Sequence, residues 1–278
     1  MVNSGSVEDG QPAPLHISGT ESAAIVRTTH LREVTVALTR RAVTGGAVIV
    51  EGAPGLGKTF ATHLVTDGLG MPCHWVAMPD RPKGKEMIAR INQVITGRIP
   101  AKNRTEFDLL EETVRLLAGP PVVLVIDEAQ HLQTGPLRQL RYLYDRPETT
   151  LLLVLVGADA GRSVSFRCPE LESRIEAVIH FKPFSGSEMR AVLESYHPMF
   201  AKTGPEVMAC MWSALGGNFR EWAKVLKAAL SLGIAPDEGL TLRNARATLR
   251  AVGRPRRGTR GPRELPRGEA GFDARPAA

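Results

Sequence analysis

Apolar positions along the chain form five short, strongly hydrophobic runs, separated by segments with helical periodicity. Two runs, Val122–Ile126 and Leu151–Val156, are apolar at every position, which is typical of strands buried on both faces of a parallel sheet. Strands that alternate with helices form right-handed βαβ units, so the pattern predicts an α/β fold with a parallel sheet sandwiched by helices. The five predicted strands are 47–50, 74–77, 122–126, 151–156 and 177–181.

Helical periodicity accounts for most of the remaining chain. Beyond Pro183 no further strand is predicted, and Ser185 and Glu188 have the spacing of a capping box that opens a helix. A small all-α lid domain is therefore expected to follow the α/β domain. The predicted helices are 21–43, 60–69, 85–96, 105–118, 136–144, 169–174, 185–196, 205–215, 218–230 and 242–252.

The two ends of the sequence differ from the middle in composition. Residues 1–20 combine Gly, Ser, Pro and acidic residues, and residues 253–278 are rich in Arg, Pro and Gly. Neither end has enough large apolar side chains to offset the entropy lost on ordering, so both are predicted to be disordered. The expected organisation is a disordered lead (1–20), an α/β domain (21–183), the all-α lid (184–252) and a disordered basic tail (253–278).

Composition places the chain among globular proteins. Its 278 residues, 43% of them hydrophobic, can bury a full core. Three scattered cysteines, Cys73, Cys168 and Cys210, favour buried or incidental thiols over a disulfide framework or a zinc site. No apolar run approaches the ~20 residues needed to cross a bilayer, and the start lacks a signal pattern. A cytoplasmic protein without a membrane partner is expected.

Positive charge is concentrated in two places. The chain carries a net charge of +6, but residues 79–105 hold seven bases against two acids and residues 251–278 hold seven against three. This distribution indicates contact with an anion such as nucleic acid, the alternative being a solvated charged face. The residues expected to contact nucleic-acid phosphates are Lys83, Lys85, Arg90, Lys102 and Arg104.

The sequence GAPGLGKT at Gly52–Thr59 meets the pattern G-x-x-x-x-G-K-[ST] in full. It follows a predicted strand and precedes a predicted helix, so backbone N–H groups and the helix dipole converge on one phosphate position. Lys58 would bridge phosphate oxygens and Thr59 would bind Mg²⁺. The alternative is a glycine turn that only ends a strand. The expected nucleotide-binding residues are Gly52, Ala53, Pro54, Gly55, Leu56, Gly57, Lys58, Thr59 and Phe60.

Two adjacent acids end the third predicted strand. Asp127 is expected to hold Mg²⁺, usually through water, and Glu128 to polarise the water that attacks the phosphate. Paired acids at a strand end could also simply solvate a loop. With the phosphate loop, they predict a Mg²⁺-dependent NTP site.

Several motifs together resemble the AAA+ ATPases, over about residues 20–252. They are GAPGLGKT, VVLVIDEAQ, the sequence LESRIE around Arg174, and GGNFR with Arg220 in the all-α region. Within this family, the chain looks most like the transposition-helper ATPases of the TniB and MuB kind. The motifs that suggest this are IVRTTHLRE, the DEAQ followed by His131 and Leu132, VLVGAD and GNFR. Bacterial DEAQ-type ATPases of secretion and replication loading are similar.

The family resemblance implies that the nucleotide is ATP and that it is hydrolysed. It also implies a role for each matching residue. Lys58 and Thr59 bind phosphate and Mg²⁺, Asp127 holds the metal, and Glu128 is the catalytic base. The segment 25–31 would lie over the adenine, the alternative being an ordinary amphipathic helix.

Two arginines complete the set of catalytic residues that the resemblance implies. Arg174 matches the arginine finger that reaches a neighbouring subunit's γ-phosphate, and Arg220 matches the lid arginine called sensor 2. Alternatively, Arg174 is a surface ion-pair partner and Arg220 caps or pairs on its helix. Arg162 and Arg167 are rival candidates for the finger.

One position departs from the family pattern. AAA+ enzymes place a polar residue, called sensor 1, at the end of the fourth strand, where this chain reads Val156-Gly157-Ala158-Asp159. Ala158 cannot form a hydrogen bond through its side chain. Slow hydrolysis is therefore expected unless Asp159 reaches into the site.

The resemblance also implies partners. ATP would close subunits into a ring or filament, and the basic segment would track duplex DNA with little sequence preference and a steep salt dependence. A transposase-like protein is a further expected partner, and the tail is a tether to nucleic acid, a hook for that partner or an extension without function. The alternative function is an AAA+ remodeller or switch that acts on a protein, of secretion or stress-response type, without DNA.

Overall fold

The protein is described by a computed structural model that covers residues 22–253, which divide into two compact units. The α/β unit comprises residues 29–181, and the helical unit combines residues 22–28 with residues 182–253. The predicted disordered lead and basic tail, apart from Gly253, lie outside the described residues. Each unit is described separately below.

A five-stranded sheet with the order β2-β3-β4-β1-β5 forms the centre of the α/β unit, and all its neighbouring strands are parallel. This confirms the predicted α/β class. The strands are β1 (Gly46–Gly52), β2 (Cys73–Ala77), β3 (Val122–Asp127), β4 (Leu151–Gly157) and β5 (Ile175–Phe181).

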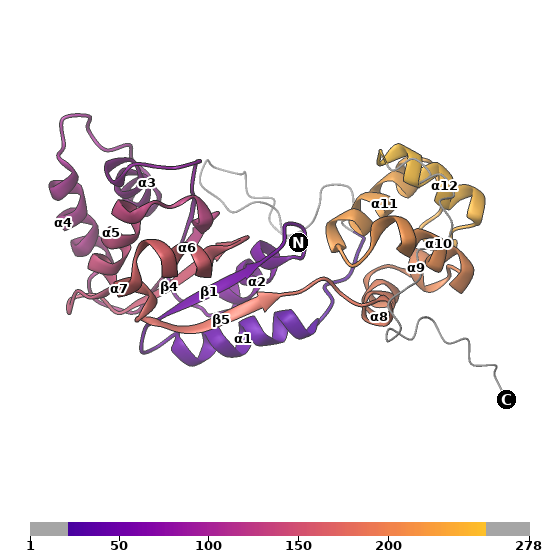
Figure 1. The fold of residues 1–278 in the computed structure, drawn as a ribbon, viewed down its shortest axis with the longest axis horizontal. Coiled ribbons are helices and arrows are strands. Elements are labelled where there is room, and N and C mark those ends of the chain that lie inside the picture. Colours follow the sequence, from indigo (N-terminus) through magenta and orange to yellow (C-terminus); the bar gives the residue numbers. More distant parts are fainter. Residues whose placement is uncertain (1–21, 254–278) are drawn as a thin grey trace, which may run out of the picture. The chain divides into compact units, whose positions relative to one another are not determined.

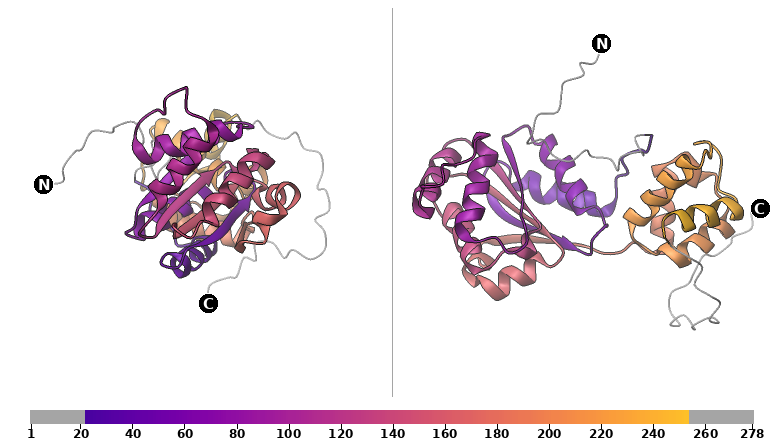
Figure 2. Two further views of the ribbon diagram at one scale, coloured as in Figure 1. Left: turned by 90° about the vertical axis from the view of Figure 1, so that its left-hand side faces the viewer. Right: turned by 90° about the horizontal axis from the view of Figure 1, so that it is seen from above.

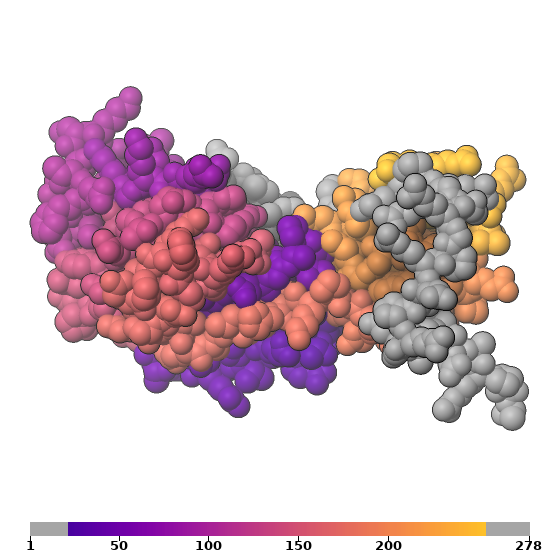
Figure 3. Space-filling model, in the orientation of Figure 1, coloured from indigo at the N-terminus to yellow at the C-terminus, as the bar shows by residue number. Residues whose placement is uncertain are grey.

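Burial explains why the inner strands are apolar at successive positions. Every residue of β4 is buried, because successive side chains enter different cores on the two faces of the sheet. Leu153 and Leu155 enter one core, whereas Val154 and Val156 enter the other. The edge strand β5 alternates exposed and partly or fully buried residues, and it lies at the surface of the face shown in Figure 3.

Helices cover both faces of the sheet (Figure 1 and Figure 2). Residues of α1 and α2 pack in the core that contains Val154, and residues of α3 to α7 pack in the core that contains Leu153. The helices of this unit are α1 (Thr29–Arg41), α2 (Lys58–Gly68), α3 (Gly84–Thr96), α4 (Glu106–Leu117), α5 (Thr134–Tyr144), α6 (Ala160–Arg167) and α7 (Pro169–Glu172), with a 3₁₀ turn at Ala129–His131.

The helical unit contains no strand among the described residues. Its helices are α8 (Gly186–Tyr196), α9 (Pro198–Ala201), α10 (Pro205–Leu215), α11 (Phe219–Ser231) and α12 (Leu242–Ala251). The predicted capping box is present at α8, where the Ser185 backbone N–H donates to Glu188 Oε2 at 2.8 Å. Trp222 fills the core edge-to-face with Phe200 and donates its indole N–H to the Gly216 carbonyl at 2.9 Å.

Residues 22–28 correct two predictions. They do not extend the first helix, which begins at Thr29, and they belong to the helical unit and not to the α/β domain. Ala23 is only 7% exposed in the core of the helical unit. The Ala24 N–H donates to the Tyr196 carbonyl at 2.8 Å, and Ser22 Oγ lies 3.2 Å from His197 Nε2. The segment 25–31, predicted to lie over adenine, is therefore split between the two units.

The cysteines within the described residues are free thiols. Burial raises the pKa of Cys73 to about 11, so this side chain is protonated at neutral pH. No helix within residues 22–253 is both long enough and apolar enough to cross a membrane.

The packing of Ala23 predicts a selective destabilisation. Ala23→Glu places a charge in the apolar core of the helical unit, and we expect it to destabilise that unit by about 2 kcal/mol or more. Hydrogen exchange should become faster in residues 182–253 and stay unchanged in residues 29–181. Ala24→Glu is the matched control because Ala24 is exposed; equal effects of the two substitutions would contradict the assignment of this segment.

Candidate nucleotide-binding and catalytic site

The loop Gly52–Gly57 joins β1 to α2 and depends on its glycines. A Cβ at Gly52 would overlap the Phe181 carbonyl oxygen of the neighbouring strand. Gly57 adopts φ +94° immediately before α2 begins at Lys58, a left-handed conformation that other residues adopt only with strain. The loop therefore turns tightly at the carboxyl end of a parallel sheet, where α/β proteins bind their ligands.

The Lys58 ammonium lies within this loop. The residue is only 9% exposed, and its Nζ donates to the carbonyls of Gly52 at 2.7 Å and Ala53 at 3.0 Å. The first turn of α2 and the Lys58 ammonium thus place positive charge at one point, as phosphate binding requires.

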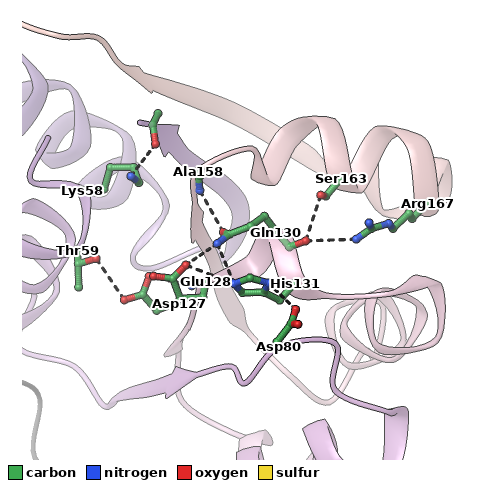
Figure 4. A network of polar contacts seen from close by, with 11 residues as sticks. Lys58, Thr59, Asp80, Asp127, Glu128, Gln130, His131, Ala158, Ser163 and Arg167 are labelled. Carbon is green, nitrogen blue, oxygen red and sulfur yellow. Dashed lines mark hydrogen bonds and ion pairs between the residues drawn. The ribbon is translucent and has the colours of Figure 1, made fainter. Parts of the chain in front are cut away.

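Thr59 and Asp127 meet across the sheet, although β4 lies between the strands that precede them. Thr59 Oγ1 donates to Asp127 Oδ2 at 3.2 Å. The other carboxylate oxygen, Oδ1, accepts the Glu128 backbone N–H at 2.9 Å. The structure thus brings together Lys58, Thr59, Asp127 and Glu128 at the same edge of the sheet (Figure 4).

Asp127 is a partly buried carboxylate with a raised pKa. Burial raises that pKa above its ordinary value, and the neighbouring Glu128 charge raises it further. The hydrogen bonds from Glu128 N–H and Thr59 and the charge of Lys58 oppose the rise without cancelling it. A divalent cation would stabilise the charged carboxylate, and the hydroxyl and carboxylate oxygens are ligands that Mg²⁺ prefers. Thr59 and Asp127 therefore fit a magnesium site.

Glu128 has an unusual backbone and a defined side-chain environment. It adopts φ +57°, which is uncommon for a residue with a side chain and is frequent at functional sites. Its Oε2 accepts a short hydrogen bond from Gln130 Nε2 and lies 3.8 Å from His131 Nε2. His131 in turn contacts Asp80 through Nδ1 at 3.0 Å.

Sequence reasoning missed Gln130 as a member of the site. Besides Glu128, its side chain contacts the end of β4, because Gln130 Oε1 accepts the Ala158 backbone N–H at 3.1 Å (Figure 4). Asp159, the alternative polar group, is exposed at the start of α6 and does not cap that helix. The one sequence feature that could have identified Gln130 is its position two residues after Glu128.

Arg174 lies away from the phosphate loop of its own chain. It precedes β5, whose first residue pairs with Ala47 near the amino end of β1, whereas the loop follows the carboxyl end of β1. Its guanidinium binds Asp145 through Nε at 2.9 Å and Nη2 at 3.3 Å. The structure therefore pairs Arg174 on the surface and does not bring it to the four site residues.

The other arginines of interest have different surroundings. Arg167 Nη1 donates to the carbonyls of Gln130 at 3.3 Å and Leu132 at 2.5 Å, so it anchors the segment that follows Glu128. Arg162 is exposed on α6. Arg220 belongs to the helical unit, where it is exposed in the first turn of α11; Asn218, not Arg220, caps that helix.

The predicted nucleic-acid residues lie on and around α3. Lys83 precedes the helix and its backbone N–H donates to Glu86 Oε2 at 2.8 Å. Lys85 and Arg90 are exposed along the helix, and Lys85 Nζ donates to the Lys102 carbonyl at 3.3 Å. Arg104 differs because it forms an ion pair with Glu112 of α4 at 2.9 Å. Helix α4 itself carries four acids and one base, so the positive surface is narrower than the sequence predicted.

Comparison with known proteins finds similarity over part of the chain. Residues 40–163 match the family described as an AAA domain. General secretion pathway protein A of Aeromonas hydrophila is 29% identical over 160 residues, which cover 53% of this chain but only 29% of that protein.

Solved structures match over a larger part of the chain. Cdc6p from Pyrobaculum aerophilum has a TM-score of 0.67 at 17% identity and covers 86% of this chain and 70% of its own. The ORC1 protein of Aeropyrum pernix in complex with DNA has a TM-score of 0.60 at 17% identity, covering 80% of this chain and 64% of its own. The α/β unit therefore has the P-loop NTPase fold.

The raised pKa of Asp127 predicts a pH dependence of stability. A buried acid with a raised pKa binds its proton more tightly in the folded state, so it lowers the free energy of unfolding as pH rises through its titration range, from about 3.9 upward. Asp127→Asn removes this loss. We expect the thermal midpoint of the α/β unit in Asp127→Asn, relative to wild type, to rise between about pH 4 and pH 8.

Asp108 provides a control of opposite sign. Hydrogen bonds from Thr105 lower the pKa of Asp108, so its charged form stabilises the fold above pH 4. Asp108→Asn should therefore be less stable than wild type by an amount that is constant above about pH 4 and shrinks as the pH falls below it. If the difference in thermal midpoint between Asp127→Asn and wild type stays constant with pH, the charged Asp127 carboxylate of the wild type does not destabilise the folded protein.

Proposed function

We propose that this chain binds ATP with Mg²⁺ and hydrolyses it to ADP and phosphate, as an AAA+ protein that assembles on duplex DNA. The observation that carries the ATPase proposal is the convergence of Lys58, Thr59, Asp127 and Glu128 at one edge of the sheet. Within residues 22–253, this edge alone combines a phosphate loop, a hydroxyl ligand and two adjacent acids.

Each residue has a role that follows from its chemistry. The backbone N–H groups of Gly52–Thr59 and the Lys58 ammonium bind the β- and γ-phosphates, which requires Lys58 to exchange the loop carbonyls for phosphate oxygens. Thr59 and Asp127 would hold Mg²⁺, which neutralises charge on the phosphates when bound. Glu128 accepts the proton of the attacking water as the new oxygen–phosphorus bond forms and the bond to ADP breaks.

Two substitutions should separate binding from hydrolysis. Lys58→Ala removes a charged hydrogen-bond donor, and we expect it to weaken ATP binding about 10- to 100-fold. Glu128→Gln keeps the shape of the side chain but cannot accept a proton, so it should retain ATP binding and lower kcat about 10²- to 10⁴-fold. Fluorescent ATP-analogue titration and phosphate release measure the two effects.

Glu238→Gln is the matched control for Glu128→Gln, because Glu238 is exposed in the helical unit. It should leave both quantities unchanged. Hydrolysis at the wild-type rate in Glu128→Gln would show that Glu128 is not the catalytic base. ATP binding that is unaffected by Lys58→Ala would show that the phosphate loop does not bind ATP.

Assembly on duplex DNA is the further part of the proposal. It is supported by the exposed bases Lys83, Lys85, Arg90 and Lys102 on one segment, and by the similar fold of the ORC1 protein solved in complex with DNA. Side chains that neutralise phosphates without reading bases give sequence-tolerant, salt-dependent binding. Arg104 contributes less in this arrangement because Glu112 already neutralises it.

The proposed assembly joins copies of the chain in a ring or filament, and the proposed biological role is that of a transposition or recombination helper with a transposase-like partner. Arg174 would then leave Asp145 and reach the γ-phosphate of a neighbouring copy, and Arg220 would contact the nucleotide of its own copy. The resemblance in the motifs supports these roles.

A protein-directed ATPase is the second candidate function. The match to General secretion pathway protein A favours it, as does the acidic surface of α4 beside the basic residues. In this alternative, the basic segment is a solvated face and the partner is a protein.

Charge reversal distinguishes the two candidates. Lys85→Glu combined with Lys102→Glu should lower affinity for a labelled random duplex at least tenfold in fluorescence anisotropy with ATP, because two phosphate contacts become repulsive. ATP binding should be unchanged. Affinity of the wild type should fall steeply between two salt concentrations.

The control reverses the same number of charges in the helical unit, with Lys202→Glu and Lys227→Glu, both exposed. It should weaken binding much less than the Lys85/Lys102 pair. If both pairs weaken DNA binding equally, the binding depends on net charge and not on the basic segment. A wild type without ATP-dependent affinity for DNA would favour the protein-directed function.

A further inference from the structure

The end of β4 provides no polar side chain for catalysis. Its last residue, Gly157, and the following Ala158 lie beside the end of β3, after which Glu128 follows, since Ile126 pairs with Leu155 in the parallel register. A carboxylate that accepts a proton from water must be held in a fixed orientation. Hydrogen-bond donors normally hold it there.

Gln130 occupies this place with its side-chain amide. Its Oε1 accepts the Ala158 backbone N–H at 3.1 Å, which fixes the orientation of the amide because only the oxygen can accept. The opposite end, Nε2, consequently points to Glu128 Oε2 and donates a short hydrogen bond to it (Figure 4).

The surroundings are shaped to this side chain. A Cβ at Gly157 would overlap Gln130 Oε1, so a residue larger than glycine at this position would displace the amide. The small residue at the end of β4 therefore makes room for the Gln130 amide, which comes from the 3₁₀ turn that follows the neighbouring strand β3.

Both N–H groups of the amide have acceptors. His131 Nδ1 contacts Asp80 at 3.0 Å and can donate its proton there, which leaves His131 Nε2 as an acceptor 3.3 Å from Gln130 Nε2. The Gln130 amide is thus held on three sides, by Ala158, Glu128 and His131.

The backbone of Gln130 is also anchored. Ser163 Oγ donates to its carbonyl at 3.4 Å, and Arg167 Nη1 donates to the same oxygen at 3.3 Å. Both side chains come from α6, so this helix fixes the segment from which the amide projects.

We propose that Gln130 is the positioning residue for Glu128, and that it replaces the polar side chain missing from the end of β4. The inference rests on the proposed ATPase activity. The amide holds the Glu128 carboxylate toward the position of the attacking water, without itself binding the nucleotide. Slow hydrolysis, which Ala158 predicted, is therefore not expected.

The test uses Gln130→Met in the full-length chain. Methionine has similar length and no N–H donor, so it fills the space beside Gly157 without holding Glu128. We expect kcat to fall about 10- to 100-fold because the hydrogen-bond donor to Glu128 is lost. KM and the affinity for a fluorescent ATP analogue should stay within twofold of wild type. In the nucleotide-free protein, exchange of the Ala158 amide hydrogen should become faster, since its acceptor is lost.

Gln133→Met is the matched control, because Gln133 contacts the His131 carbonyl and not Glu128. It should leave kcat unchanged. A Gln130→Met variant with kcat within twofold of wild type, with a higher kcat, or with ATP affinity lost in step with rate would overturn the proposal. Failure of the ATPase proposal is recognised separately, because the wild type itself would then show no hydrolysis that depends on Lys58.

Discussion

The register of the parallel strands is the constraint on which the site depends. Glu51 of β1 pairs with Gly157 of β4, and Ile126 of β3 pairs with Leu155, so the ends of three strands lie at one level. The Gly52 N–H continues the pairing to the Ala158 carbonyl at 3.2 Å. A shift of one residue in any of these strands would separate Thr59 from Asp127 and turn buried side chains toward the wrong face. The two apolar cores hold the strands in this register and therefore also determine where the side chains of the site lie.

Local patterns predicted the parts of this arrangement that depend on neighbouring residues. Continuous apolar runs identified β3 and β4, and the glycine loop identified the turn before α2. Helix α6 was not predicted, because only Ala160 and Val164 of its eight residues are buried and its other positions are small, polar or exposed. The role of Gln130 was not predictable either, since it depends on a neighbour, Ala158, that is 28 residues away.

Charge shows the same limit of sequence reasoning. Counting bases over residues 79–105 predicted a strongly positive surface, but the folded chain brings α4 beside them, with Glu112 paired to Arg104. Net charge over a segment describes a surface only when the elements packed against it are known. Lys83, Lys85, Arg90 and Lys102 stay exposed, whereas Arg104 is partly buried and paired.

The helical unit is built from two pieces of chain that are separated by the whole α/β unit. During synthesis from the N-terminus, residues 22–28 emerge before the α/β unit, whereas Tyr196 and His197, which they contact, emerge after it. The α/β unit is contiguous and can fold as soon as β5 is made, since domains generally fold as units during synthesis. Completion of the helical core must then wait for both pieces, so the helical unit can finish folding only after the whole α/β unit has been synthesised.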